Sequence, residues 1–119
     1  MRGPRSRRYH GGRWRVLARV ERFAEPALLL LLREQPAHGY DLLERLPELT
    51  GESRVEMGNL YRLLRALEEE GLVASTWSDG KRTYATTDRG RQLLDQWAAA
   101  LRVSQERTQR FLERYEGGR

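Results

Sequence analysis

The apolar residues between Met57 and Gly71 recur at the spacing of an amphipathic helix. They occupy positions i, i+3, i+4 and i+7, at Leu60, Leu63, Leu64 and Leu67. This spacing predicts one buried stripe, and Gly71 is a natural residue for the C-terminal end of the helix. Ser53-x-x-Glu56 has the spacing of a capping box, so the helix could begin anywhere from Ser53 to Met57.

The other side of this helix carries hydrogen-bond donors and a planar ring, at Asn59, Tyr61, Arg62 and Arg65. Such groups suit phosphates and base edges. Arg62 has no carboxylate three or four residues away, so we expect its guanidinium to be free for an outside partner. Arg65 can instead pair with Glu68 or Glu69. The helix is therefore either a nucleic-acid contact or an ordinary solvent-exposed surface.

Three shorter helices are predicted before it. Residues 14–24 place apolar side chains on one face and arginines on another, as in a short basic amphipathic helix. Ala27–Arg33 is almost wholly apolar and follows Pro26, where a helix can begin, so we expect a core helix. A third helix is expected over His38–Leu46, with His38 as a packing or capping residue and Pro47 as an interruption.

A β-hairpin is predicted after the long amphipathic helix. Val73–Trp77 and Arg82–Thr86 are short β-prone runs, and Asp79-Gly80 between them is a strong two-residue turn signal. Lys81 then lies with Arg82 at the tip or just past it, either as a functional pair or as solvated charge.

The final predicted helix starts after Thr87, a good N-cap, and runs from Asp88 to about Tyr115. Its a and d heptad positions are Leu94, Trp97, Leu101, Ser104, Thr108, Phe111 and Tyr115. The helix would be about 40 Å long at 1.5 Å per residue, and a small domain has little core to cover such a stripe. We therefore expect a homodimer of crossing helices, through Leu94, Trp97, Leu101, Phe111 and Tyr115.

Charge is concentrated at one end of the chain. The 119 residues carry a net charge of +5, but residues 1–22 hold eight arginines and one glutamate, a net +7. The remainder carries 14 basic and 16 acidic residues, a net −2. A basic arm of this kind suits contact with a polyanion, either nucleic acid or a membrane surface, or is a solubilising tail.

Several classes of function are disfavoured. The chain has no cysteine, and its two histidines lack metal-ligand spacing, so no metal site or cofactor is expected. No catalytic residue set is recognisable, and we expect a protein that is not an enzyme. No apolar run of 18 residues is present, and neither a membrane span nor a signal peptide is expected, which indicates a cytoplasmic protein.

The order of elements predicts a mainly α-helical fold with a small β-hairpin. After the short basic helix of residues 14–24, three helices, a two-stranded hairpin and a long helix make a winged helix-turn-helix with a C-terminal dimerisation helix. The predicted parts are a basic N-terminal arm with a short amphipathic helix over 1–22, the DNA-binding domain over 23–87, and the dimerisation helix over 88–119.

Three motifs resemble one family. They are His38-Gly39-Tyr40-Asp41-Leu42, the run Leu60-Tyr61-Arg62-x-Leu64-x-x-Leu67-Glu68-x-x-Gly71-Leu72-Val73, and Tyr84-x-x-Thr87-Asp88-x-Gly90-Arg91. Together they closely resemble the PadR family of transcriptional regulators, and its smaller subgroup with a single C-terminal helix. Where many family members have Ser-Pro-Gly-Thr at the start of the recognition helix, this chain has Glu56-Met57-Gly58-Asn59. The basic N-terminal extension is also longer than usual in the family.

The resemblance implies a homodimeric repressor that binds a palindromic DNA operator. The residues that would then face DNA are Tyr40, Gly58, Asn59, Tyr61, Arg62, Arg65, Lys81 and Arg82. Trp97 resembles a tryptophan that binds planar hydrophobic effectors in some small PadR proteins, although an apolar seam tryptophan is also an ordinary core residue. An alternative function is a protein-interaction or membrane-surface adaptor that uses the basic helix of residues 14–24.

Overall fold

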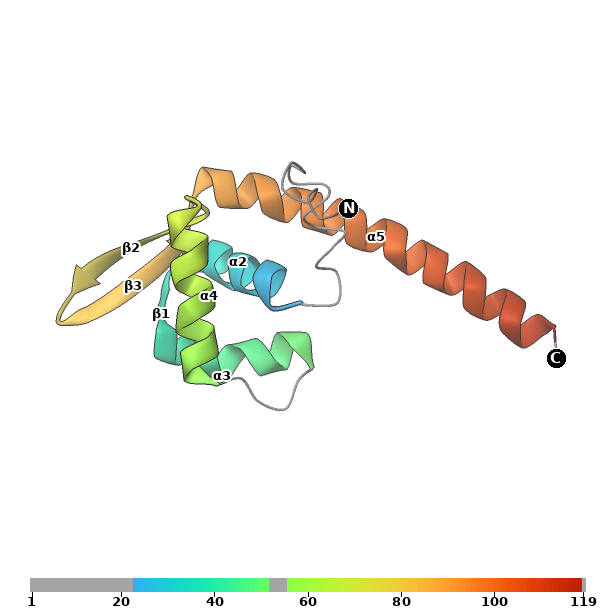
Figure 1. The fold of residues 1–119 in the computed structure, drawn as a ribbon, viewed down its shortest axis with the longest axis horizontal. Helices are drawn as coiled ribbons and strands as arrows, with labels where there is room; N and C mark the ends of the chain where they lie inside the picture. Colours follow the sequence, from blue (N-terminus) through green and yellow to red (C-terminus); the bar gives the residue numbers. More distant parts are fainter. Residues whose placement is uncertain (1–22, 52–55, 119) are drawn as a thin grey trace, which may run out of the picture. The chain divides into compact units, whose positions relative to one another are not determined.

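A computed structural model describes residues 23–51 and 56–118. Their helices and strands follow the order α2 (Ala24–Glu34), β1 (Ala37–His38), α3 (Gly39–Thr50), α4 (Met57–Glu69), β2 (Val73–Ser78), β3 (Lys81–Thr86) and α5 (Asp88–Gly117) (Figure 1). The predicted basic arm, the amphipathic helix of residues 14–24 up to residue 22, and Ser53 of the predicted capping box lie outside the described residues.

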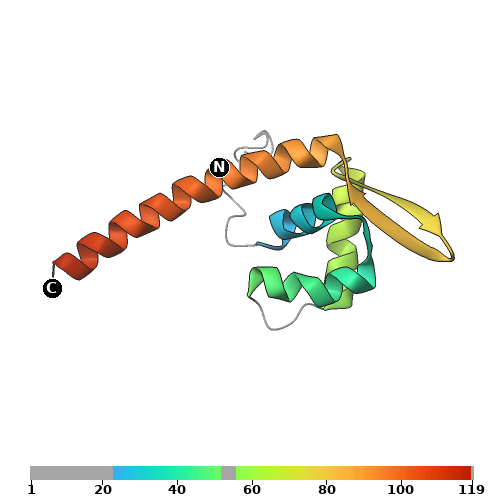
Figure 2. The ribbon, with the colours of Figure 1, turned by 180° about the vertical axis from the view of Figure 1, so that it is seen from behind.

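The helices pack around a leucine core. α2 packs against α3, α3 against α4, and α4 against β2, and both Figure 1 and Figure 2 show the hairpin projecting away from α2, α3 and α4. The side chains with the least exposure among these elements are Leu28, Leu29, Leu42, Leu46, Leu60, Leu64, Leu67 and Val73. The predicted fold of three helices, a hairpin and a long final helix is thereby confirmed.

The hairpin has the turn that its sequence predicts. Asp79 and Gly80 both have positive φ, 53° and 75°, which is the conformation of a two-residue type I′ turn. β2 and β3 are paired antiparallel from Val73↔Thr86 to Ser78↔Lys81. The sequence did not predict a third strand: β1 pairs with β3, so the sheet order is β1-β3-β2.

Two helix boundaries differ from prediction. α2 begins at Ala24, two residues before Pro26, because the first-turn N–H groups have no intrahelical acceptor and proline is tolerated there. α3 does not end at Leu46 but continues through Pro47 to Thr50. Full burial of Leu46 and a left-handed cap at Gly51, whose N–H donates to the Pro47 carbonyl over 2.9 Å, offset the hydrogen bond that Pro47 cannot donate.

The start of α5 is fastened to the base of the hairpin. Thr87 caps the helix as predicted, since its Oγ1 accepts from the Gly90 N–H over 3.1 Å and donates to the Gly71 carbonyl over 2.6 Å. A Cβ on Gly90 would lie 2.1 Å from the Leu72 carbonyl oxygen, so only glycine fits this crossing. The compact unit that contains the helix-turn-helix and the hairpin ends at Leu94, and the rest of α5 belongs to a separate unit.

Candidate nucleic-acid interface

α4 has the two faces that its sequence predicts. Leu60, Leu64 and Leu67 are buried, and Leu63 is half-buried. The polar residues on the other side are all exposed: Gly58, Asn59, Tyr61, Arg62 and Arg65. α3 and α4 are consecutive helices that pack against each other, as in a helix-turn-helix, and the second of them presents donors to solvent.

Arg62 is not as free as its sequence neighbours suggest. It has no ion pair in the described part of the chain, but its Nη1 donates to the Asn59 Oδ1 over 3.0 Å. The Asn59 amide in turn donates to the Glu56 Oε1 over 3.5 Å. The spacing of carboxylates in the sequence could not predict the bond from Arg62 to Asn59, because its acceptor is an amide oxygen. The bond uses one donor of five, so the guanidinium retains donors for an outside acceptor.

Arg65 makes no ion pair with Glu68 or Glu69 within residues 56–118. The Glu68 carboxylate instead accepts from the Ser75 hydroxyl over 2.7 Å. The intrahelical pair that the sequence allowed is therefore absent from this part of the structure, and Arg65 is available to a ligand.

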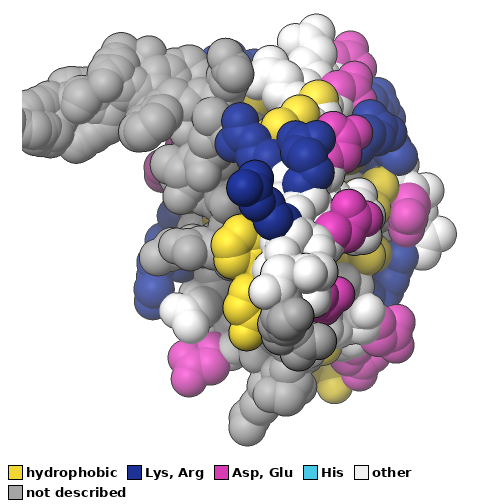
Figure 3. Space-filling view, turned by 90° about the vertical axis from the view of Figure 1, so that its right-hand side faces the viewer, with side chains coloured by type: hydrophobic (Ala, Val, Ile, Leu, Met, Phe, Trp, Pro, Cys, Tyr) yellow, Lys and Arg dark blue, Asp and Glu magenta, His cyan; other side chains and the backbone are white. Residues whose placement is uncertain are grey.

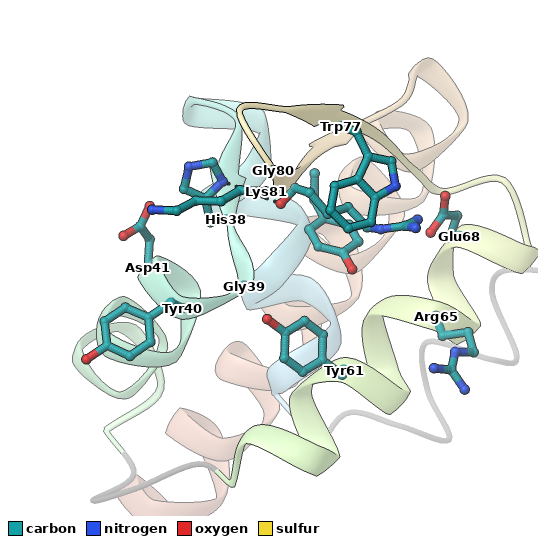
Figure 4. A pocket seen from close by; sticks show the side chains of 12 residues that line it. His38, Gly39, Tyr40, Asp41, Tyr61, Arg65, Glu68, Trp77, Gly80 and Lys81 are labelled. Atoms are coloured by element: carbon teal, nitrogen blue, oxygen red, sulfur yellow. Dashed lines mark hydrogen bonds between the residues drawn. The ribbon is translucent and has the colours of Figure 1, made fainter.

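A groove of about 940 Å³ lies between the start of α3, α4 and the hairpin (Figure 4). Its lining includes Tyr40, Tyr61, Arg65, Trp77, Lys81 and Tyr84. Four of these were predicted from sequence to face DNA. Trp77 and Tyr84 were not, although the two-residue turn at Asp79-Gly80 places both on one face of the hairpin with Arg82, since side chains alternate along a strand.

Tyr61 and Gly39 determine how α4 meets α3 at the floor of this groove. In Figure 4 the Tyr61 ring points from α4 toward Gly39. A Cβ at Gly39 would lie 2.6 Å from the Tyr61 hydroxyl oxygen and 2.7 Å from two ring carbons. Gly39 is thus required for the ring to approach the first turn of α3.

Tyr84 is the most buried of the three tyrosines that line the groove. The residue is 6% exposed, and burial raises the pKa of its phenol above the ordinary 10.0, an effect that the nearby Arg82 guanidinium partly opposes. The hydroxyl is therefore neutral at physiological pH and able to donate.

His38 joins the hairpin to α3. It is the N-cap residue of α3, but its side chain makes no capping bond. Its Nδ1 instead lies 3.2 Å from the Thr83 Oγ1 on β3. The imidazole is thus a packing residue, one of the two roles predicted for it, and the described residues contain no cluster of three or more His, Asp or Glu side chains that could hold a metal ion.

Lys81 and Arg82 are the first two residues of β3, at the hairpin tip as predicted. Both are exposed. They point to opposite faces of the hairpin because they are consecutive in a strand. Only Arg82 therefore shares a face with Trp77, over whose ring its Cζ lies 4.9 Å from the centroid.

The residues of the predicted heptad seam lie on α5. Leu94 and Trp97 are already buried in the single chain, and Leu101 is half-buried. The exposed large hydrophobic side chains of its C-terminal half are Val103, Phe111, Leu112 and Tyr115. Figure 3 shows charged side chains of both signs and hydrophobic side chains exposed together on one face of the protein.

These features define a winged helix-turn-helix protein, with α4 in the place of the recognition helix and the β2–β3 hairpin as the wing. Residues 28–96 match the family model of the transcriptional regulator PadR-like family. The chain therefore belongs to the PadR-like family of transcriptional regulators, as its motifs predicted. No curated protein matches the chain.

Several solved structures of transcriptional regulators are similar along most of the chain. A PadR family regulator from Eggerthella lenta is 34% identical, with a TM-score of 0.70, over 83% of this chain and 89% of the other. A transcriptional regulator from Thermoplasma acidophilum is 28% identical, with a TM-score of 0.67, over 79% of this chain and 94% of the other. Bacillus subtilis PadR, solved in complex with operator DNA, is 30% identical, with a TM-score of 0.53, over 62% of this chain and 45% of the other.

No helix in the described segments is both long enough and apolar enough to span a membrane.

Proposed function

We propose that this regulator is a repressor that binds a palindromic DNA operator as a homodimer and is released by a small-molecule effector. The observation that carries the proposal is the division of α4 into a buried leucine face and an exposed face of donors, on which neither Arg62 nor Arg65 has an ion pair among the described residues. A helix anchored in this way can enter a major groove without disturbing its own core. The solved complex of Bacillus subtilis PadR with operator DNA supports this assignment.

The proposed contacts fall into two groups. Asn59, Arg62 and Arg65, with Gly58 allowing close approach, lie on α4 and would read base edges or position α4 against phosphates. The groove between α4 and the wing suits the phosphate backbone that separates the two DNA grooves. Its donors, at Tyr40, Tyr61, Lys81 and Arg82, would bind that backbone.

The homodimer is proposed to form through the seam of α5. Phe111 and Tyr115 are 67% and 62% exposed, and their rings stack in parallel with centroids 6.2 Å apart. Burying each against a second chain would contribute about 1.5–3 kcal/mol. Leu94, Trp97 and Leu101 lie earlier on the same seam, where the side chains are already wholly or partly covered.

The proposed effector is a planar hydrophobic compound, with Trp97 as the residue that would stack on it. The ring is 0% exposed in the single chain, so ligand access would require an opening movement. Quenching of tryptophan fluorescence by a planar dye, and its loss in Trp97→Ala, would test this role. Equal dye binding by Trp97→Ala would make Trp97 an ordinary core residue.

Arg62→Ala tests the DNA-binding function directly. We expect affinity for DNA from upstream of the protein's own gene to fall by about 1–3 kcal/mol if Arg62 contacts a base, and similarly for random duplex if it contacts phosphate. Arg91→Ala is the matched control, because Arg91 is already paired with Asp88 over 3.1 Å. Unchanged binding of both duplexes by Arg62→Ala would remove Arg62 from the interface.

A further inference from the structure

One face of the wing runs from the core to solvent. Ser75 and Trp77 on β2 and Arg82 and Tyr84 on β3 share this face, because the strands pair Ser75↔Tyr84 and Trp77↔Arg82. Near the base the face is covered, and Tyr84 is buried. Near the tip it is open, and Trp77 is 65% exposed. Arg82 therefore lies at the border between the domain and any partner beside the wing.

Two neighbours hold the Arg82 guanidinium. Its Nη1 donates to the Ser75 Oγ over 3.0 Å, and its Cζ lies 4.9 Å from the centroid of the Trp77 ring. The planar group is thus held at one edge and on one face. An exposed arginine ordinarily samples many rotamers, and ordering such a side chain on binding costs about two- to twelve-fold in affinity.

The support of Arg82 extends to the recognition helix. The Ser75 hydroxyl that accepts from Arg82 donates its own proton to the Glu68 Oε2 over 2.7 Å. Glu68 belongs to α4, one turn after Arg65. A chain of contacts therefore runs from α4 through Ser75 to Arg82 and Trp77, and the position of the wing arginine follows that of the helix.

Arg82 keeps donors for an outside acceptor. A guanidinium has five N–H groups, and the described hydrogen bond uses one. Residues 23–51 and 56–118 place no carboxylate within 4.0 Å of it as an ion pair. Its charge is therefore available to an anion, and its orientation is set in advance.

We propose that Trp77, Ser75 and Glu68 are positioning residues that hold Arg82 ready to donate to a phosphate of the DNA strand passing beside the wing. This inference rests on the proposed DNA-binding function. Arg82 makes the contact, and the other three act through it. The orientation of the wing arginine relative to α4 is therefore fixed before DNA binds.

A double-mutant cycle tests the arrangement. Wild type, Trp77→Ala, Arg82→Ala and the double variant are titrated with a random-sequence duplex, and with a duplex from upstream of the protein's gene, over a range of salt concentrations. Arg82→Ala should lower the log–log salt slope by about 0.9 for each protomer bound. Trp77→Ala should weaken binding about two- to twelve-fold with the slope retained, and should cost nothing further once Arg82 is absent.

Three further variants separate positioning from general structural effects. Trp77→Phe keeps a ring under the guanidinium and should restore most of the affinity. Thr76→Ala, on the opposite face of the same strand, should bind as wild type. Lys81→Ala should lower the salt slope while leaving the cost of Trp77→Ala unchanged, because Lys81 is on the other face. Denaturation midpoints identify any variant that fails to fold, in which case Ser75→Ala takes the place of Trp77→Ala.

The inference and the proposed function fail differently. Absence of DNA binding by the wild type would overturn the proposed function, together with the inference that rests on it. If Arg62→Ala weakens binding but Arg82→Ala keeps both affinity and salt slope, only the inference is overturned. It is also overturned if Trp77→Ala costs as much in the Arg82→Ala background as in wild type, since Trp77 would then act without Arg82.

Discussion

Substituting alanine at two helix-start glycines should change stability with opposite signs. Gly39 is the first residue of α3 and Gly58 the second of α4. A Cβ on Gly39 would lie 2.6–2.7 Å from the Tyr61 ring and hydroxyl, whereas one on Gly58 would have nothing within 4 Å. Neither glycine is among those with positive φ. The two substitutions therefore differ mainly in the presence of Tyr61.

The magnitude follows from the overlap at Gly39. The contacts are about 0.7–0.8 Å shorter than the 3.4 Å at which ordinary contact begins, so Tyr61 or α4 must move. Overpacking of this kind costs about 1–3 kcal/mol, and removing a glycine returns about 0.4–1 kcal/mol. We expect Gly39→Ala to lower the free energy of unfolding by about 0.5–2 kcal/mol, and Gly58→Ala to raise it by about 0.5–1 kcal/mol.

The assay is chemical denaturation at fixed protein concentration, followed by DNA titration. Gly39→Ala should also weaken DNA binding, because the displaced ring lines the groove between α4 and the wing. In the Tyr61→Ala background, Gly39→Ala should cost little stability, because the ring that its Cβ would meet is absent. If Gly39→Ala stabilises the protein as much as Gly58→Ala, the approach of Tyr61 to α3 is not the constraint described above.

Three other perturbations test the remaining structure. Gly90→Ala should destabilise the fold by about 2–3 kcal/mol, because the added Cβ would meet the backbone oxygen of Leu72. The control Gly117→Ala, with nothing within 4 Å of the added Cβ, should be neutral or stabilising. Equal denaturation midpoints for the two variants would contradict the close approach of Gly90 to Leu72. Phe111→Glu should give a monomer with an unchanged helical spectrum, since Phe111 is 67% exposed in the single chain, and a monomeric wild-type mass at tens of micromolar would contradict the dimer. Because burial raises the pKa of Tyr84, its contribution to stability is fully present below the unfolded value of about 10 and is lost as pH rises through the folded pKa. Tyr84→Phe should therefore reduce the loss of stability at alkaline pH. An identical dependence of stability on pH in the variant and the wild type would contradict the burial effect.

Local interactions explain what the sequence determined by itself. The leucine stripe of α4, the Asp79-Gly80 turn and the Thr87 cap each depend on residues within a few positions of one another, and all three are present in the structure. The family motifs led to the same fold. Of the proposed interface, the exposed residues of α4 and the two cations of the wing tip could be predicted in this way.

Tertiary contacts determined the features that the sequence did not predict: the third strand, the length of α3 and the groove beside the wing. Strand β1 is two residues long and forms only because β3 supplies its partners, while α3 passes Pro47 because Leu46 is buried in the core. The groove and the support of Arg82 depend on contacts from Glu68 to Ser75 and from Ser75 to Arg82. These residues come from different elements, whose distances are set by packing rather than by chain spacing. No periodicity in the sequence encodes such a distance, so only the folded structure shows that a wing arginine and the recognition helix share one support.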